Sequence, residues 1–163
     1  MRKIIEGTVH LFGNNIDTDQ IYPGRYLDLT DPQEIAKHCL EGADRSFVAR
    51  CKPGDIVVAG TNFGCGSSRE HAAIALKTLG VGAVVAGSFA RIFYRNAVNM
   101  GLPVLICRDA ENLAARSQRL RIDLSDGTIR NEQGETAQAE PISDYAMEIL
   151  EAGGIKALML RNG

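Results

Sequence analysis

A glycine-rich turn between two apolar patterns constrains the fold of this chain more than any other feature. Residues 60–71 read Gly-Thr-Asn-Phe-Gly-Cys-Gly-Ser-Ser-Arg-Glu-His. An apolar run at 55–59 precedes them, and apolar residues on one helical face follow as far as Leu79. The pattern predicts a strand over 55–59 that turns into a helix over 68–79. Because open α/β sheets bind ligands at the carboxyl ends of their strands, this turn is the first candidate for a site.

The turn has the composition of an anion-binding site. The first N–H groups of a helix lack intrahelical partners and the helix dipole is positive there, so a carboxylate or phosphate is favoured. Ser67 or Ser68 is predicted to cap the helix. Arg69 adds a guanidinium, which binds carboxylates through two parallel hydrogen bonds. A capped helix after a glycine-rich turn, with no ligand, is the alternative interpretation of the same residues.

The residues after Gly66 exclude three better-known glycine motifs. A nucleotide-binding P-loop has lysine before its final serine or threonine, whereas Ser67 and Ser68 follow Gly66 directly. A dinucleotide fingerprint requires glycine where Arg69 stands. A hydrolase nucleophile elbow requires glycine two positions after its serine, where this chain has Arg69 or Glu70. An independent serine hydrolase is therefore disfavoured.

Strand patterns alternate with helical patterns around the turn. The predicted strands are 8–12, 55–59, 83–86 and 103–106, and the predicted helices are 31–38, 68–79 and 88–99. Asp31 and Ser88 are predicted N-caps, and Pro32 suits the first helical position. A β-α-β-α-β series folds into a parallel sheet with right-handed crossovers. The expected fold class is α/β, with a mostly parallel central sheet flanked by helices.

The C-terminal part is predicted to carry structure more than chemistry. Strand patterns at 120–124 and 128–130 flank Ser125-Asp126-Gly127, which is a hairpin signal. A helix is predicted over 143–151, with a serine cap at its start and two glycines after it. The chain has no internal repeat, linker or low-complexity tract. Residues 1–163 are therefore expected to form a single domain.

Composition limits the classes of partner. A formal charge of −2 provides no basic field, so nucleic-acid or membrane binding by electrostatics is not expected. No apolar run approaches the length of a membrane span, and charged residues interrupt the N-terminus too early for a secretory signal. The expected location is the cytoplasm.

Three segments resemble, in the same order, the swivelling domain of the aconitase superfamily. They are Asp17-Thr18-Asp19-Gln20-Ile21 with Pro23-Gly24-Arg25-Tyr26-Leu27, then Gly-Ser-Ser-Arg-Glu-His at 66–71, then Ser-Phe-Ala-Arg-Ile-Phe-Tyr-Arg-Asn at 88–96. Because the chain is short, it is similar to the free-standing small subunits of isopropylmalate isomerase or homoaconitase rather than to single-chain aconitases. The resemblance implies a swivelling β/β/α domain that works with a separate large subunit, in a heterodimer or heterotetramer.

The resemblance also implies a hydro-lyase reaction. A small hydroxy-dicarboxylate is dehydrated and rehydrated, as 2-isopropylmalate is converted to 3-isopropylmalate in leucine biosynthesis. Ser67 matches the family's general base, and Asp19 matches an active-site aspartate that organises a basic group of the other domains. A serine is a weak base, so its alkoxide needs positive surroundings: the helix N-terminus, a guanidinium and backbone donors. The residues predicted to bind substrate are Cys65, Gly66, Ser68 and Arg69.

The resemblance places a [4Fe–4S] cluster in the large subunit and no metal in this chain. The four cysteines are dispersed and form no Cys-x-x-Cys pair, unlike common cluster or zinc spacings. Cys39, Cys51 and Cys107 are expected to be reduced and partly buried. Cys65 is distinguished from these three cysteines only by its position next to Gly66, in the candidate site. No cofactor is expected to be bound by this chain.

The three histidines are weak candidates for catalysis. His10 and His38 are expected at ordinary packing or surface positions. His71 belongs to the motif but lies about one helical turn beyond Ser67. Two interpretations of His71 stay open: a supporting or helix-packing residue, and a residue of the site.

The loop Tyr26-Leu27-Asp28-Leu29-Thr30 is predicted to select the substrate. Homoaconitase-like relatives carry an arginine shortly after Tyr-Leu, where this chain has Asp28, which would repel a third carboxylate. Leu27 or Leu29 could pack on an alkyl group, so an isopropylmalate-type substrate is expected. The alternatives are an Asp28 that is merely solvated and an Arg25 that recruits the third carboxylate. The small subunit of a homoaconitase, citramalate or dimethylmalate dehydratase and a non-enzymatic anion-binding regulatory module also stay open.

Overall fold

The computed structural model describes residues 3–162. Strands and helices alternate through most of the chain, and three further strands and two helices follow. In chain order the elements are β1 (Ile4–Leu11), α1 (Thr18–Ile21), the 3₁₀ turn η1 (Gly24–Tyr26), α2 (Pro32–Ala36), α3 (Phe47–Arg50), β2 (Ile56–Ala59), α4 (Glu70–Leu79), β3 (Ala83–Ala86), α5 (Arg91–Asn99), β4 (Val104–Ile106), α6 (Ala110–Ala115), β5 (Arg119–Asp123), β6 (Thr128–Asn131), β7 (Thr136–Gln138), α7 (Asp144–Ala152) and α8 (Ile155–Asn162).

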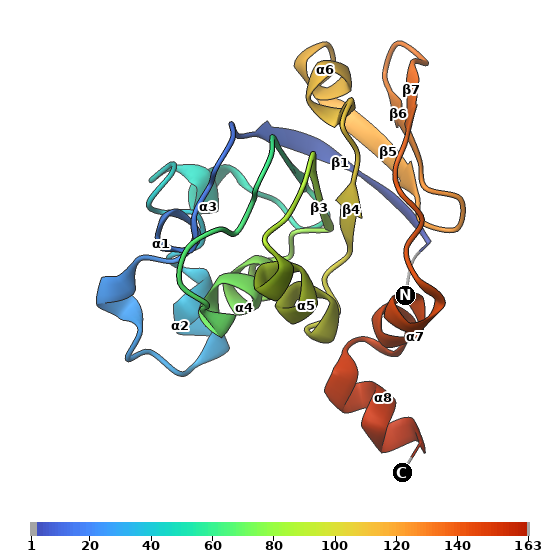
Figure 1. The fold of residues 1–163 in the computed structure, drawn as a ribbon. Helices are drawn as coiled ribbons and strands as arrows, with labels where there is room; N and C mark the ends of the chain where they lie inside the picture. The colour runs from blue at the N-terminus through green and yellow to red at the C-terminus, as the bar shows by residue number, and fades with distance from the viewer. Residues whose placement is uncertain (1–2, 163) are drawn as a thin grey trace.

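One seven-stranded sheet runs through the molecule in the order β4-β3-β2-β1-β5-β6-β7. β1 to β4 pair in parallel, and β5, β6 and β7 pair antiparallel. β1 joins the two halves, because its later residues pair with β2 and its earlier residues pair with β5. Figure 1 shows β1 as the long strand that connects them. The predicted α/β class with its central parallel sheet is confirmed.

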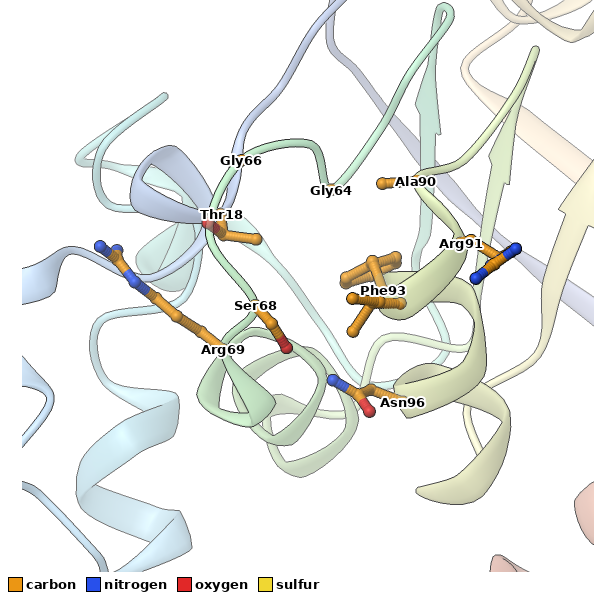
Figure 2. Close-up of a pocket in the computed structure, with 10 residues that line it drawn as sticks. Thr18, Gly64, Gly66, Ser68, Arg69, Ala90, Arg91, Phe93 and Asn96 are labelled. Atoms are coloured by element: carbon orange, nitrogen blue, oxygen red, sulfur yellow. The ribbon is translucent and has the colours of Figure 1, made fainter.

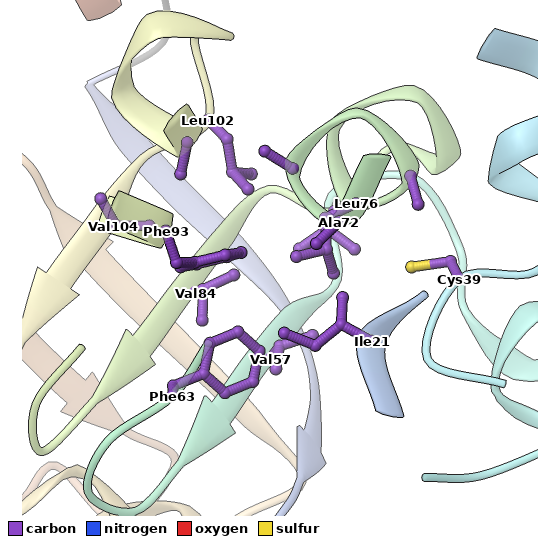
Figure 3. Packing of buried hydrophobic residues seen from close by; sticks show 14 of the residues in the cluster. Ile21, Cys39, Val57, Phe63, Ala72, Leu76, Val84, Phe93, Leu102 and Val104 are labelled. Carbon is purple, nitrogen blue, oxygen red and sulfur yellow. The ribbon is translucent and has the colours of Figure 1, made fainter. Parts of the chain in front are cut away.

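The central parallel strands β2 and β3 are buried on both faces of the sheet. In β2, Val57 belongs to the apolar cluster packed on α4 and α5, whereas its neighbour Ile56 belongs to a second cluster packed on α6. Figure 3 shows Val57 and Val84 in the first cluster, close to Leu76 of α4 and Phe93 of α5. Burial on both faces explains why these strands appear in the sequence as continuous apolar runs.

The predicted serine caps of the two central helices are wrong. α4 begins at Glu70 with Arg69 as its N-cap residue, and α5 begins at Arg91 after Ala90. Neither N-cap side chain makes a capping hydrogen bond. Before α5, the N–H of Ala90 donates to Phe63 and the carbonyl of Ser88 accepts from Phe63, so residues 88–90 stay extended. The Ser88 hydroxyl accepts instead from the N–H of Asn62 at 2.8 Å.

The predicted N-caps of α2 and α7, the glycine stop of α7 and the hairpin are confirmed. Asp31 caps α2 by accepting from the N–H of Gln33 at 3.1 Å, although the helix ends at Ala36 rather than at 38. Ser143 caps α7, and Gly153 ends it in the left-handed region, with φ of +92°. The predicted hairpin is present as β5 and β6. β1 begins four residues earlier than predicted, and α1, α3, α6, α8 and β7 were not predicted.

The helices of the described chain are short. Within residues 3–162, none is both long and apolar enough to cross a membrane.

Candidate functional site

The glycine-rich turn leaves β2 and reaches α4 through residues in the left-handed region. Asn62, Gly64 and Gly66 have φ of +62°, +85° and +96°. At Gly64 an added Cβ would lie 2.4 Å from Phe93 of α5, so only glycine fits there. Gly66 has more space, and its nearest neighbour would be the Thr18 hydroxyl at 3.5 Å. Two of the glycines thus have distinct purposes: close packing on α5 at Gly64 and a sharp change of direction at Gly66.

Two other segments hold the turn from its sides. On one side, the N–H of Gly64 donates to the Ile16 carbonyl at 2.7 Å, and Thr18 donates to the turn twice. On the other side, Phe63 and residues 88–90 exchange backbone hydrogen bonds of 2.9 and 3.0 Å. The three segments that resemble the aconitase superfamily in sequence are therefore neighbours in space.

A cavity of about 270 Å³ lies between the turn and the start of α5. Ser68 of the turn and Asn96 of α5 point toward one another across it, and Phe93 forms its apolar wall (Figure 2). The cavity lining consists of Thr18, Gly64, Gly66, Ser68, Arg69, Ala90, Arg91, Ile92, Phe93 and Asn96. Ser67 is exposed at the same turn, next to this lining, and Cys65 is half-buried.

Arg69 contributes to the cavity lining, but its guanidinium is held away from the cavity. Its side chain extends away from Ser68 and Asn96 (Figure 2). Its Nη1 donates to the Asp19 carboxylate and to the Tyr22 carbonyl, both at 2.9 Å. The Arg69 side chain is 17% exposed, against 67% for Asp19. The guanidinium therefore has a fixed position, with the N–H groups of its other two nitrogens outside these two bonds.

Two neighbouring groups lower the pKa of the Asp19 carboxylate. The hydrogen bond from Arg69 lowers the pKa of Asp19 below its ordinary value, and the N–H of Gly24, which donates at 2.8 Å, lowers it further. The group that Asp19 organises in this structure is thus Arg69 of the same chain. Asp17, two residues earlier, caps α1 in a capping box with Gln20.

His71 lies behind the turn. Its ring stacks on Tyr22 with centroids 5.1 Å apart, and its Nε2 lies 3.1 Å from the Leu29 carbonyl. These contacts give His71 a packing position, as one of the two interpretations predicted. They also connect α4 to the loop 26–30 through the Leu29 backbone.

The loop 26–30 is held by a polar cluster around Glu41. Glu41 accepts from Tyr26 and Arg25, both at 2.9 Å, and lies 2.6 Å from Nδ1 of His38. The Tyr26 ring stacks on His38 with centroids 3.6 Å apart. Leu27, Asp28 and Thr30 are exposed, whereas the Leu29 side chain is partly buried against the core. The exposed side chains of the loop are thus Leu27, Asp28 and Thr30, rather than Leu29.

Among the residues that the structure describes, no group of possible metal ligands contains more than one cysteine. Cys39 and Cys107 are buried and Cys51 is half-buried. Burial raises the pKa of the Cys51 thiol to about 11. Within residues 3–162, the one group of three possible metal ligands is His10, Cys51 and Asp55, with ligand atoms within 4.8 Å of one another. A single thiolate does not fit an iron–sulfur cluster, which is held mostly by cysteines.

His10 is a buried packing residue, as predicted. Its Nε2 lies 2.8 Å from the Asp55 carboxylate, and Phe47 packs on the ring with centroids 5.0 Å apart. Its Nδ1 is buried without a hydrogen-bond partner within residues 3–162. The contact with Asp55 joins β1 to the start of β2.

Three cavity residues with polar side chains, Thr18, Arg91 and Asn96, were not predicted as site residues. Arg91 and Asn96 belong to the 88–96 segment that was recognised, but no role followed from their spacing. Their positions on the first two turns of α5 bring them to the cavity. Thr18 lies between the two aspartates of the first segment. Its sequence position gives no sign of the two hydrogen bonds by which it holds the turn.

Comparison with known proteins gives one consistent result. The family model of the aconitase C-terminal domain matches residues 3–109. The chain is 52% identical to 3-isopropylmalate dehydratase small subunit 1 of Methanopyrus kandleri, over 100% of this chain and 96% of that protein. It is 51% identical to the isopropylmalate/citramalate isomerase small subunit of Methanocaldococcus jannaschii, over 95% of this chain and 93% of that protein. A crystal structure of a 3-isopropylmalate dehydratase from the latter organism superimposes with a TM-score of 0.91 at 46% identity, covering 98% of this chain and 95% of that one.

Proposed function

This chain belongs to the family of aconitase C-terminal domains, and on that premise we propose that it is the small subunit of a 3-isopropylmalate dehydratase. The enzyme is a hydro-lyase that interconverts 2-isopropylmalate and 3-isopropylmalate by dehydration and rehydration. The observation that carries the proposal is the turn at 66–69, which presents two exposed serines and a fixed arginine beside a cavity. A protein that spans nearly the whole length of this chain and is about half identical to it bears the same name.

Ser67 acts as the general base in this proposal. It removes a proton from the carbon next to a substrate carboxylate, while the hydroxyl group leaves the adjacent carbon as water. When water adds back with the opposite orientation, the hydroxyl and the proton return to exchanged carbons. Positive surroundings favour the alkoxide form that this role requires. The guanidinium of Arg69 and the amino end of α4 are the positive groups near the turn.

The substrate carboxylates bind to groups of the same turn. Ser68 donates its hydroxyl to one carboxylate, and Gly66 and Cys65 supply backbone contacts. Arg69 donates through the N–H groups of Nη2 and Nε, because its Nη1 is taken by Asp19 and Tyr22. Asp19 therefore acts through Arg69, by keeping the guanidinium oriented and close to the turn.

The partner of this chain is a large subunit that carries a [4Fe–4S] cluster. When bound there, the cluster supplies a Lewis acid for the hydroxyl and a carboxylate of the substrate. Within residues 3–162 this chain supplies no set of thiolates for it, since the one group of possible metal ligands contains a single cysteine. The two subunits form a heterodimer or heterotetramer in the cytoplasm, and the substrate lies between them.

The exposed part of the loop 26–30 selects the substrate. Asp28 is exposed and repels a third carboxylate, while Leu27, 41% exposed, packs on the alkyl group of the substrate. Such a contact favours an alkyl-substituted malate by about 1–3 kcal/mol. Citramalate is a second candidate, because the relative at 51% identity is named for both isopropylmalate and citramalate.

The test is co-expression of this chain with a cluster-bearing large subunit, followed by purification of the complex. We expect the complex to interconvert 2-isopropylmalate and 3-isopropylmalate, with transient absorbance of the unsaturated intermediate. A cluster-loaded complex that binds isopropylmalate and citramalate but converts neither would instead favour the non-enzymatic anion-binding module.

A further inference from the structure

The two hydrogen bonds that Thr18 donates hold the turn on both sides of Gly66. The Thr18 N–H donates to the Cys65 carbonyl at 2.8 Å, and the Thr18 hydroxyl donates to the Ser67 carbonyl at 2.7 Å. Thr18 is 4% exposed, so water does not compete strongly for either bond. The backbone and the side chain of Thr18 therefore hold the Cys65–Gly66 peptide and the Ser67–Ser68 peptide, respectively.

The glycines leave the backbone of the turn free to adopt other conformations, so the position of Ser67 has to be fixed by contacts from outside the turn. Gly64 and Gly66 both lie at positive φ, in a region where glycine moves freely. Gly64 is confined by Phe93, but a Cβ at Gly66 would meet nothing closer than 3.5 Å. A general base has to be placed within about 0.5 Å of its productive position to work well. The restraint on the side of Ser67 comes from the Thr18 hydroxyl.

The Thr18 hydroxyl also sets the direction of the Ser68 N–H, which belongs to the same peptide group as the Ser67 carbonyl. Because a trans peptide is planar, its C=O and N–H point in opposite directions. With the Ser67 carbonyl bound to Thr18, the Ser68 N–H is directed away from Thr18. That N–H remains a backbone donor for an anion, which is the kind of group that stabilises a developing alkoxide or carboxylate.

Thr18 is itself rigid. It is the first residue of α1, directly after Asp17, whose side chain accepts from the N–H of Gln20 at 2.8 Å. The Gln20 side chain in turn accepts from the N–H of Asp17 at 3.0 Å. This capping box fixes the start of α1 and so the direction of the Thr18 hydroxyl.

We infer that Thr18 is a positioning residue for the reaction, acting through its hydroxyl on the Ser67 carbonyl. This inference rests on the proposed function, in which Ser67 is the base. In this role Thr18 sets the place and direction of Ser67 and of the Ser68 N–H, which contact the substrate in the proposed function.

The first experiment compares Thr18→Val and Thr18→Ser in the assembled enzyme. Valine keeps the shape and the backbone N–H but removes the hydroxyl, and serine keeps the hydroxyl. We expect kcat to fall about 10- to 100-fold in the valine variant with KM within about threefold, and the serine variant to retain most of kcat. Thr8→Val is the matched control, because the Thr8 hydroxyl lies on β1, outside the turn, and accepts a hydrogen bond from Arg119 at 3.4 Å.

The second experiment uses the chain alone. Amide hydrogen exchange of residues 64–69 should become faster in Thr18→Val, while exchange in β2, β3 and β4 stays unchanged. If valine does not fold, Thr18→Ala replaces it. Failure of both variants to fold would assign the hydroxyl to folding rather than positioning and would overturn the inference, as would a folded valine variant with the wild-type kcat. An inactive wild-type complex would instead count against the proposed function.

Discussion

At the residue scale, the site depends on side chains that meet across long stretches of the chain. Thr18 binds Ser67, 49 positions away, and Asp19 binds Arg69, 50 positions away. Adjacent residues of the first segment thus hold two residues of the turn, one by its carbonyl and one by its guanidinium. The chemistry of the turn therefore depends on α1 as much as on β2 and α4.

Ser67→Ala is expected to abolish most of the catalytic activity of the assembled enzyme without changing its stability. Loss of a general base lowers kcat by about 100- to 10,000-fold. Ser67 is exposed, so the melting temperature of the chain should stay the same. The measurement is steady-state isomerisation of isopropylmalate, with Ser125→Ala in the β5–β6 turn as the control. Near-wild-type kcat would transfer the role of base to another residue, and Ser68 would be tested next.

Arg69→Lys is expected to weaken substrate binding more than it slows the reaction. Lysine keeps the charge but cannot donate to Asp19 and Tyr22 while also forming a two-pronged contact with a carboxylate. We expect KM to rise by about tenfold, with a smaller change in kcat. Asp19→Asn is the companion variant, since it keeps the shape and removes the charge opposite Arg69. An unchanged KM in Arg69→Lys would exclude a direct contact with substrate.

Asp28→Arg is expected to shift the preference of the enzyme toward tricarboxylates. The side chain is exposed, so the substitution changes the charge of the loop without disturbing the core. The ratio of kcat/KM for homoaconitate to that for isopropylmalate should increase. Asp28→Asn separates the loss of repulsion from the gain of attraction. A wild-type preference for homoaconitate, or an unchanged ratio in the arginine variant, would show that this position does not select the substrate.

At the scale of elements, the turn is packed between α1 and α5. Phe63 and residues 88–90 are joined by backbone hydrogen bonds, and Phe93 fills the space beside Gly64. The aromatic rings of Phe63 and Phe93 meet edge to face, with centroids 5.2 Å apart. Movement of α5 would therefore move the turn, and the cavity between them has a defined shape because both of its sides are held.

Gly64→Ala is expected to destabilise the chain more than a comparable change elsewhere. Its Cβ would lie 2.4 Å from the buried Phe93, and its φ of +85° is unfavourable for alanine. The expected loss in free energy of unfolding is about 2–4 kcal/mol, from backbone strain and overpacking together. Gly134→Ala is the matched control: its φ is +81°, but nothing lies within 4 Å of the added Cβ. Urea unfolding gives the free energy of unfolding of both variants. Equal losses in the two variants would show that the contact with Phe93 does not add to the destabilisation.

At the scale of the whole molecule, β1 joins a parallel half that carries the turn to an antiparallel half that carries none of the predicted site residues. The cavity lies at the carboxyl end of the parallel strands, between the ends of β2 and β3 and the helices that follow them. The loop 26–30 lies beyond Arg69 and Tyr22, connected to α4 by His71. Because the serines and the loop are exposed, the proposed function requires the large subunit to enclose the substrate.

The isolated chain is expected to show no turnover of isopropylmalate. It supplies a base and carboxylate contacts but no cysteine set for a cluster within residues 3–162. Adding the cluster-loaded large subunit should restore isomerisation in proportion to complex formation. Circular dichroism serves as the control that the isolated chain is folded. Sustained turnover by the purified, metal-free chain would contradict this division of roles.

The sequence by itself determined the order of the elements around the turn, the α/β class and the family. These follow from near neighbours: the period of apolar residues, the spacing of glycines, and three short segments in a fixed order. β3 was predicted with its observed bounds, and the left-handed Gly153 ends α7 as expected. The catalytic role of Ser67 and the binding role of Arg69 stay predictions.

Only the tertiary structure decided where α4 and α5 begin and which groups face the cavity. The caps were predicted from local preference, but Thr18 binds the Ser67 carbonyl and Phe63 binds residues 88–90, so both segments stay extended. In the same way, the partner of Asp19 is Arg69, and Asn96 faces Ser68. Such contacts join residues about 25 to 50 positions apart, and local preference cannot specify which remote hydrogen-bond partner reaches a backbone group first.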